Sequence, residues 1–140
     1  MVVSVFGSDS LVDHLRLGHA LSPLRDQNVV IIGSGMTVHN LDPPKCDVTS
    51  GGVDPSYLSR ADEFNDAAVF AATDDVGLVR ENQLHDLYER EDIRLFHPSL
   101  EHLLPLGVCC GAAGEDAGRC LFNYVDYDGL GWSNIVFASG

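Results

Sequence analysis

The sequence has few basic residues, no long apolar run and no C-x-x-C pair of cysteines. Eight Lys and Arg residues stand against 21 Asp and Glu, so the formal net charge is −13 at pH 7. An acidic surface of this strength repels the phosphates of nucleic acids and the headgroups of anionic membranes. We therefore expect neither a nucleic acid nor a membrane as a partner.

The apolar segments are also too short to cross a bilayer, which takes roughly 20 residues. The first residues lack the basic cluster that precedes the core of a signal peptide, which favours a cytoplasmic protein. Four cysteines without a C-x-x-C motif indicate neither a zinc ribbon nor a thioredoxin-like redox site. We expect the adjacent Cys109 and Cys110, which lie in an apolar run, to be small buried hydrophobic residues.

A chain of 140 residues with 45% hydrophobic content can form one domain with a substantial core, so residues 1–140 are treated as a single domain. Short β-branched runs alternate with helical periodicities, which is typical of an α/β fold with a mixed central sheet flanked by helices. We expect strands at residues 2–6, 28–32, 119–127 and 132–138, and a short extended run at 93–98. We expect helices at residues 11–24, 59–72, 73–88 and 99–113, and a long loop at 41–57.

The most informative segment is a run of four β-branched residues at 29–32, which ends in a Gly-Ser-Gly turn and is followed by His39. Such a run is typical of a buried strand, and ligands gather at the carboxyl ends of strands in parallel or mixed sheets. A nucleotide site is disfavoured, because Val38 stands where the third glycine of the dinucleotide fingerprint belongs and no Gly-Lys-Ser/Thr follows. The G-x-S-x-G pattern of a serine hydrolase is also not met. His39 is the candidate functional residue of this segment.

A second group of candidates lies at residues 97–106, where the sequence is His-Pro-Ser-Leu-Glu-His-Leu-Leu-Pro-Leu. His97 is expected at the end of an extended segment, and Glu101 and His102 on the helix that follows, so that imidazole and carboxylate groups converge. These are the ligands that non-haem Fe(II) and zinc favour. Taken singly, each histidine is more commonly a hydrogen-bonded structural residue than a ligand.

Four blocks of sequence together resemble the class III extradiol ring-cleavage dioxygenases. They are residues 20–26, 30–41, 97–106 and 111–114, and their order and spacing match as well as their residues. The nearest branch is the DOPA 4,5-dioxygenase type, whose members share a fold with protocatechuate 4,5-dioxygenase. The resemblance covers nearly the whole chain but only about the C-terminal half of a typical member. The expected fold is therefore the C-terminal half of a dioxygenase domain of this type.

This resemblance implies a role for each candidate residue. His39 matches the active-site histidine that acts as acid and base toward the catechol hydroxyl and bound oxygen, with contact to the metal in zinc-loaded relatives. His97 matches the histidine that completes the metal site. Glu101 and His102 become substrate-binding candidates, with Glu101 as a fallback carboxylate ligand. The implied cofactor is Fe(II), with zinc as an alternative occupant, and the implied substrates are a catechol and O₂.

The resemblance also implies a departure, because in the family the N-terminal half supplies two further metal-binding histidines. Three functions stay open on the sequence. The first is an extradiol dioxygenase, the second is a catalytically incomplete fragment or partner subunit, and the third is a small-molecule binding module that uses loop 41–57 as a lid. Missing sheet edges expose apolar surface, so we expect self-association or a complementing N-terminal half.

Overall fold

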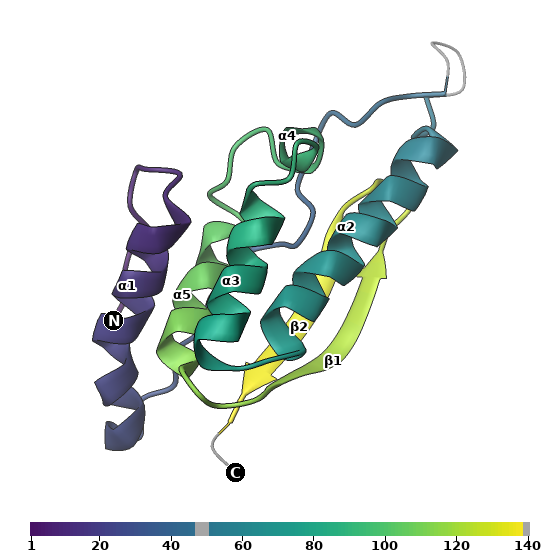
Figure 1. Cartoon of the computed structure of the whole chain (residues 1–140). Coiled ribbons are helices and arrows are strands. Elements are labelled where there is room, and N and C mark those ends of the chain that lie inside the picture. The colour runs from purple at the N-terminus through teal and green to yellow at the C-terminus, as the bar shows by residue number, and fades with distance from the viewer. Residues whose placement is uncertain (47–50, 139–140) are drawn as a thin grey trace.

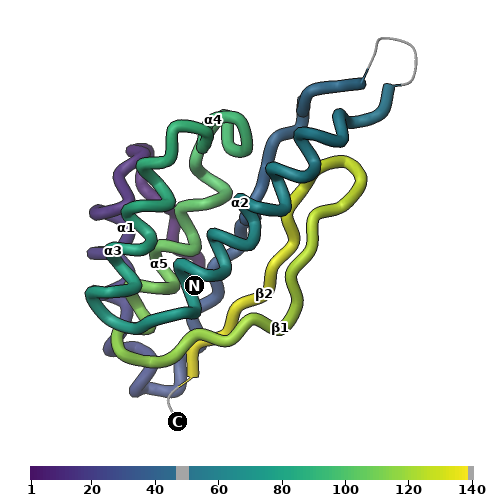
Figure 2. The backbone as a smooth tube through the Cα atoms, turned by 45° about the vertical axis from the view of Figure 1, so that its right-hand side comes forward, coloured from purple at the N-terminus to yellow at the C-terminus, as the bar shows by residue number. Residues whose placement is uncertain are grey.

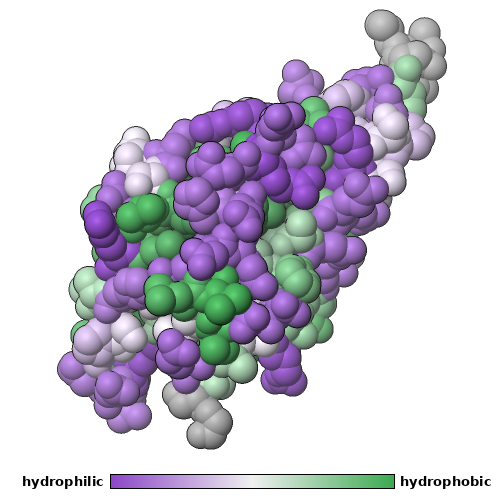
Figure 3. All heavy atoms as spheres, viewed as in Figure 1, coloured by the Kyte–Doolittle hydropathy of each residue, from purple (hydrophilic) through white to green (hydrophobic). Residues whose placement is uncertain are grey.

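A computed structural model describes residues 1–46 and 51–138 of the chain (Figure 1). The elements follow one another as helix α1 (Leu11–Leu21), the 3-10 helix η1 (Ser22–Gln27), α2 (Pro55–Thr73), α3 (Gly77–Tyr88), α4 (Ile93–Phe96), α5 (Leu104–Ala113), and the strands β1 (Gly118–Val125) and β2 (Gly131–Phe137). Helices α1, α3 and α5 lie together on one side, and α2 lies over the two strands (Figures 1 and 2). The face seen in Figure 3 is largely hydrophilic, as expected from the acidic composition.

The α1–α5 interface is the closest helix contact in this layer. Helix α1 begins at a capping serine, Ser10, whose side chain accepts a hydrogen bond from the Asp13 backbone N–H at 3.2 Å. A Cβ atom added at Gly18 would overlap the backbone of α5 at Val108, and one added at Gly111 would overlap the backbone of α1 at Leu15. The two helices therefore meet backbone to backbone, which only glycine permits at these positions.

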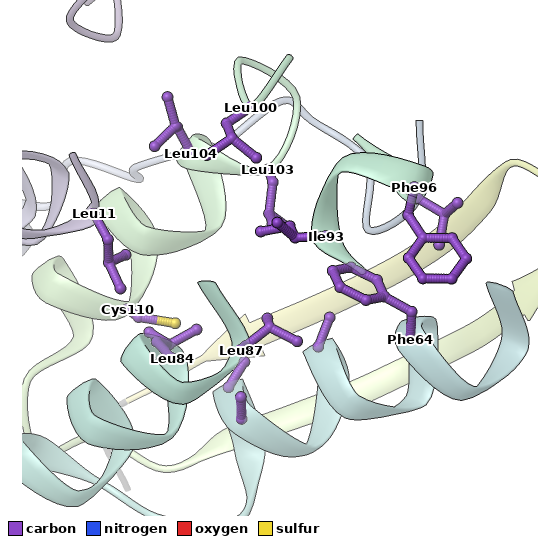
Figure 4. Close-up of a cluster of buried hydrophobic side chains, with 14 of the residues drawn as sticks. Leu11, Phe64, Leu84, Leu87, Ile93, Phe96, Leu100, Leu103, Leu104 and Cys110 are labelled. Atoms are coloured by element: carbon purple, nitrogen blue, oxygen red, sulfur yellow. The ribbon is translucent and has the colours of Figure 1, made fainter. Parts of the chain in front are cut away.

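The core lies between α2, α3 and α5, where the apolar faces of the helices meet (Figure 4). Phe64 of α2 and Phe96 of α4 pack with ring centroids 4.8 Å apart. Helix α2 also packs against both strands, and the Ala72 carbonyl lies close to Gly118 of β1. The core members labelled in Figure 4 are Leu11, Phe64, Leu84, Leu87, Ile93, Phe96, Leu100, Leu103, Leu104 and Cys110.

Strands β1 and β2 form an antiparallel hairpin whose register pairs Asn123 with Ser133. The turn between them depends on Asp126, whose carboxylate accepts backbone N–H bonds from Asp128 and Leu130, each at 3.0 Å. Gly129 in this turn has a φ of 83°, a conformation that favours glycine. The sequence predicted both strands to within two residues.

The predicted strands at residues 2–6 and 28–32 are wrong for this structure, and so is the mixed central sheet. Among the described residues the sheet has two antiparallel strands, β1 and β2. Val30 and Ile32 are 81% and 83% exposed rather than buried. A β-branched run favours a strand only where a neighbouring strand supplies hydrogen bonds and a packing surface, and no described strand pairs with these residues.

The helical predictions were correct in existence but not at their ends. Residues 93–96 form one helical turn instead of an extended run, because Ile93 and Phe96, three residues apart, then both face the core. Helix α5 begins at Leu104 rather than at 99, with Pro105 in its first turn. Thr73 ends α2 instead of capping α3, and its hydroxyl donates to the Val69 carbonyl at 2.8 Å.

The remaining expectations concern the loop and the cysteines. The predicted loop at 41–57 is shorter, because α2 begins at Pro55, and residues 47–50 of this loop lie outside the described residues. Cys110 is buried as expected, whereas Cys109 is half-buried.

Candidate functional site

Residues 36–40 carry the site, and neighbouring elements hold their backbone from both sides. On one side the Met36 N–H donates to the His102 carbonyl at 2.8 Å, and the His39 N–H donates to the Phe96 carbonyl at 3.0 Å. On the other side the Gly131 N–H of β2 donates to the Val38 carbonyl at 2.9 Å. His39 therefore directly follows Val38, which forms an isolated bridge with Gly131, and does not stand at the end of a strand of a central sheet.

His39 and His102 lie face to face in this site. Their ring centroids are 3.7 Å apart and the rings are inclined by 24°, and both side chains are half-buried. Burial and the nearby charge of His102 both lower the pKa of His39 below its usual value. The His39 imidazole is therefore mainly neutral near pH 7 and can accept a proton from a bound group.

Glu101 lies beside this pair and is exposed. Its carboxylate is 4.0 Å from Nε2 of His102. A hydrogen bond with the Ser99 side chain, together with the nearby histidines, lowers the pKa of Glu101. The structure thus brings three of the four candidate side chains, His39, Glu101 and His102, to one part of the surface.

His97 is placed differently, since it is fully buried between α4 and residues 36–40. Its Nε2 donates to the Thr37 carbonyl at 2.8 Å, and its Nδ1 has no hydrogen-bond partner among the described residues. Desolvation lowers the pKa of His97 to about 4, so the ring is neutral at physiological pH. With the proton on Nε2, Nδ1 carries a free lone pair of the kind that binds a metal ion. This nitrogen is, however, buried away from solvent.

The side chains that could bind a metal do not complete a site by themselves. Imidazole and carboxylate are suitable donors for Fe(II) or zinc, and the orphaned Nδ1 of His97 is one such donor. Within residues 1–46 and 51–138, however, no group of three or more His, Cys, Asp or Glu side chains has the geometry to hold a metal ion. A metal at this position needs donors in addition to those of the described residues.

A groove of about 720 Å³ leads to the site. It lies between residues 28–37 on one side and β2 on the other, and His102 and Thr37 are part of its lining. Val38, the residue after Thr37 of the groove lining, forms an isolated bridge with Gly131 of β2. The groove thus connects the unpaired 29–32 segment with His102 of the histidine pair.

Sequence reasoning missed two residues that hold the site. The Asn40 amide donates to the Leu95 carbonyl at 2.8 Å, and its Oδ1 accepts the Asp42 N–H at 3.0 Å. The sequence Asn-Leu-Asp-Pro-Pro at 40–44 contains a turn signal that could have indicated the second bond. Thr37 links His97 to α2, and no local signal marks it because its partners are distant in sequence.

In the part of the chain that the structure describes, no helix combines the length and the apolarity that crossing a bilayer requires.

Comparison with known proteins identifies a family that matches nearly the whole chain. The family model for the catalytic LigB subunit of aromatic ring-opening dioxygenase matches residues 1–138. The 4,5-DOPA dioxygenase extradiol of Mirabilis jalapa is 39% identical over 115 residues, which cover 81% of this chain and 39% of that protein. The 4,5-DOPA dioxygenase extradiol of Beta vulgaris is 36% identical over 129 residues, which cover 90% of this chain and 44% of that protein. The chain thus spans less than half the length of these relatives.

A solved structure gives the same fold. An uncharacterized protein from Escherichia coli K12 superposes with a TM-score of 0.68 at 23% identity, covering 91% of this chain and 50% of that chain. At this identity the likeness concerns the fold alone. The family model matches nearly the whole chain, and the chain therefore belongs to the LigB family of aromatic ring-opening dioxygenases, the class III extradiol enzymes.

Proposed function

We propose that this chain forms part of the active site of an extradiol dioxygenase, which opens a catechol-type ring with O₂ at a non-haem metal. The observation that carries the proposal is the stacked pair of His39 and His102, of which His102 lines the groove, in a chain of this family. A binding module without oxygenase activity is not favoured, because the family and the relatives are named as dioxygenases.

In this proposal His39 is the general base and acid. Its lowered pKa keeps the imidazole neutral, so it takes a proton from a catechol hydroxyl and returns it later in the reaction. His102 stacks on the His39 ring and fixes its plane, and Glu101 beside it faces the substrate. Glu101 and His102 are exposed enough to contact a ligand, whereas His97 is buried beneath residues 36–40.

The metal is proposed to be Fe(II), with zinc as an alternative occupant. When bound, such a metal would hold the catecholate oxygens and pass electrons from the ring to O₂. Because the described residues do not complete a metal site, additional protein ligands must come from elsewhere. The sequence assigned His97 and His39 as metal ligands, and this assignment stays a prediction.

We further propose that the other half of the fold completes the molecule, either as a further segment of the same protein or as a second polypeptide. The relatives are more than twice as long as the segment that matches this chain. Residues 29–32 and the outer edge of β2 face each other across the groove, and such edges readily pair with an added strand. A second copy of this chain is the alternative occupant, and a cytoplasmic location stays a prediction.

The experiment is an anaerobic Fe(II) titration, followed by oxygen uptake with DOPA. We expect weak iron binding by the chain alone. Adding the part of the Mirabilis jalapa relative that this chain does not align with should give stoichiometric binding, oxygen uptake and a ring-opened product. In that mixture His39→Gln should lower the rate of oxygen uptake by about 100-fold or more, because acid–base catalysis contributes that much.

The matched control is His85→Gln, which changes an exposed histidine of α3 and should leave the rate unchanged. A His39→Gln mixture that turns over at the unmodified rate would exclude His39 as the acid and base. Iron binding without oxygen uptake in the unmodified mixture would instead favour a binding role.

A further inference from the structure

A cluster of polar side chains lies under the site, at the junction of α2, β1, β2 and residue 37. Its members are Thr37, Asn65, Asp66, Asn123 and Ser133, which we call the polar cluster. Asn65 and Thr37 are buried, whereas Asp66 is exposed. Buried polar groups are costly unless they are hydrogen-bonded, so a satisfied cluster of this size fixes one geometry of the elements that it joins.

The chemistry of the cluster gives a direction to the bonds that lead from Asp66 through Asn123 and Asn65 to Thr37. Its carboxylate can only accept, so the Asn123 amide donates to Asp66 Oδ1, at 2.7 Å. Asn123 then presents its Oδ1 to the Asn65 amide, also at 2.7 Å. Asn65 in turn presents its own Oδ1 to the Thr37 hydroxyl, which donates to it. Ser133 sits between the two asparagines, 2.5 Å from the Asn123 Oδ1 and 3.0 Å from the Asn65 Oδ1.

Thr37 also connects the polar cluster to the histidines, through its backbone carbonyl and the peptide chain that follows it. Its carbonyl can only accept, so the bond of 2.8 Å from His97 Nε2 fixes the proton of His97 on that nitrogen. His39 lies two residues further along the same backbone, and its N–H is bonded to Phe96, the neighbour of His97. One threonine therefore joins the polar cluster to both histidines.

We propose that Asn65 and Thr37 are positioning residues, which hold residues 36–39 so that the His39 ring stays stacked on His102 and His97 keeps its proton on Nε2. This inference rests on the proposed role of His39 in ring opening. Neither residue touches His39 directly, and both act through the backbone of the segment. Without the Thr37 side-chain bond, the segment keeps its bonds to Phe96, His102 and Gly131 but loses its tie to α2.

The test compares Thr37→Val with Thr37→Ser in the full chain, using NMR of histidine-labelled protein and amide hydrogen exchange. Valine has nearly the shape of threonine but lacks the hydroxyl. We expect Thr37→Val to shift the ring resonances of His39 and His102. The Met36 and His39 amides should exchange about tenfold faster relative to the α5 amides, as the loss of one buried hydrogen bond predicts. Thr37→Ser, which restores the hydroxyl, should return both signals toward those of the unmodified chain.

The control is Thr73→Val, which removes a threonine hydroxyl bond at the far end of α2 and should leave the His39 and His102 resonances unchanged. If Thr37→Val does not fold, Ser133→Ala removes a hydroxyl of the same cluster that lies outside residues 36–39, and it should shift the same resonances less. Unchanged ring resonances with uniformly faster exchange, or no recovery with serine, would overturn the inference. These readouts need neither metal nor catechol, so they are independent of whether the ring-opening proposal holds.

Discussion

The α1–α5 interface and the segment at residues 29–32 are both apolar, yet only the first is buried. In the interface, glycines let two helix backbones touch, and apolar side chains such as Leu11 and Leu15 are buried within the chain. In the segment, Val30 and Ile32 point into solvent beside an open groove. The difference shows that an apolar sequence indicates which residues gain free energy from burial. Whether they are buried depends on a neighbouring element that covers them.

The largest change should come from filling the helix interface. Gly18→Val places a branched side chain against the backbone of Val108 and Ala112, which cannot move without separating α1 from α5. We expect a loss of more than about 3 kcal/mol in the free energy of unfolding, measured by urea denaturation. Gly7→Val is the control, because no described atom lies within 4 Å of a Cβ at that position, and it should change stability by less than about 0.5 kcal/mol. Equal effects at the two glycines would contradict the close contact.

The next prediction concerns the buried His97, as distinct from the half-buried pair of His39 and His102. The pKa of His97 is lowered from its usual 6.5 to about 4 in the folded chain. Its contribution to stability is therefore complete above pH 6.5 and is lost as the pH falls from about 6.5 to about 4, because the unfolded chain takes up the proton first. We expect this loss to be about 3 kcal/mol.

The measurement is urea denaturation across that pH range, for the unmodified chain and for His97→Gln. Glutamine can still donate to the Thr37 carbonyl but does not titrate, so the variant should lose about 3 kcal/mol less than the unmodified chain over the same window. The comparison cancels the titration of the other groups. Parallel pH profiles for the two proteins would mean that burial does not keep His97 neutral.

The smallest effect on stability is expected for substitutions in the exposed segment at residues 29–32. There we expect a change in self-association instead. Changing Val30 and Ile32 together to threonine should alter the free energy of unfolding by less than about 0.5 kcal/mol, since both are exposed. Ile93→Thr, a buried counterpart, should cost about 2 kcal/mol. Sedimentation velocity should detect self-association of the unmodified chain that weakens in the double variant. A monodisperse unmodified chain would argue against an open apolar edge.

The same distinction explains how far the sequence alone could predict this fold. The hairpin was predictable because alternating burial and a turn around Gly129 are local signals. Helices α2 and α3 were predictable from their periodicity, although their ends depend on bonds such as that from Thr73 to Val69. The strand at 28–32 was not, because its pattern carries no information on whether a neighbouring strand exists.

For the site, the sequence identified the residue types but not their arrangement. The Gly-Ser-Gly turn and the His-Pro motif indicated His39 and His102, which the structure brings into contact. The burial of His97 depends on its contacts with Phe64 and Thr37. Both residues are far from His97 along the chain, so no local sequence pattern indicates these contacts. The polar cluster around Asn65 was invisible for the same reason.

The long sequence separations around Thr37 bear on how the chain folds. Its partners Asn65, His97 and Ser133 lie 28, 60 and 96 residues away. Contacts of such high contact order require the closure of long loops, so they form slowly compared with helices and the hairpin turn. The histidine pair is therefore expected to assemble among the last parts of the chain during folding, and the stacking of His39 on His102 would report that the whole chain has folded.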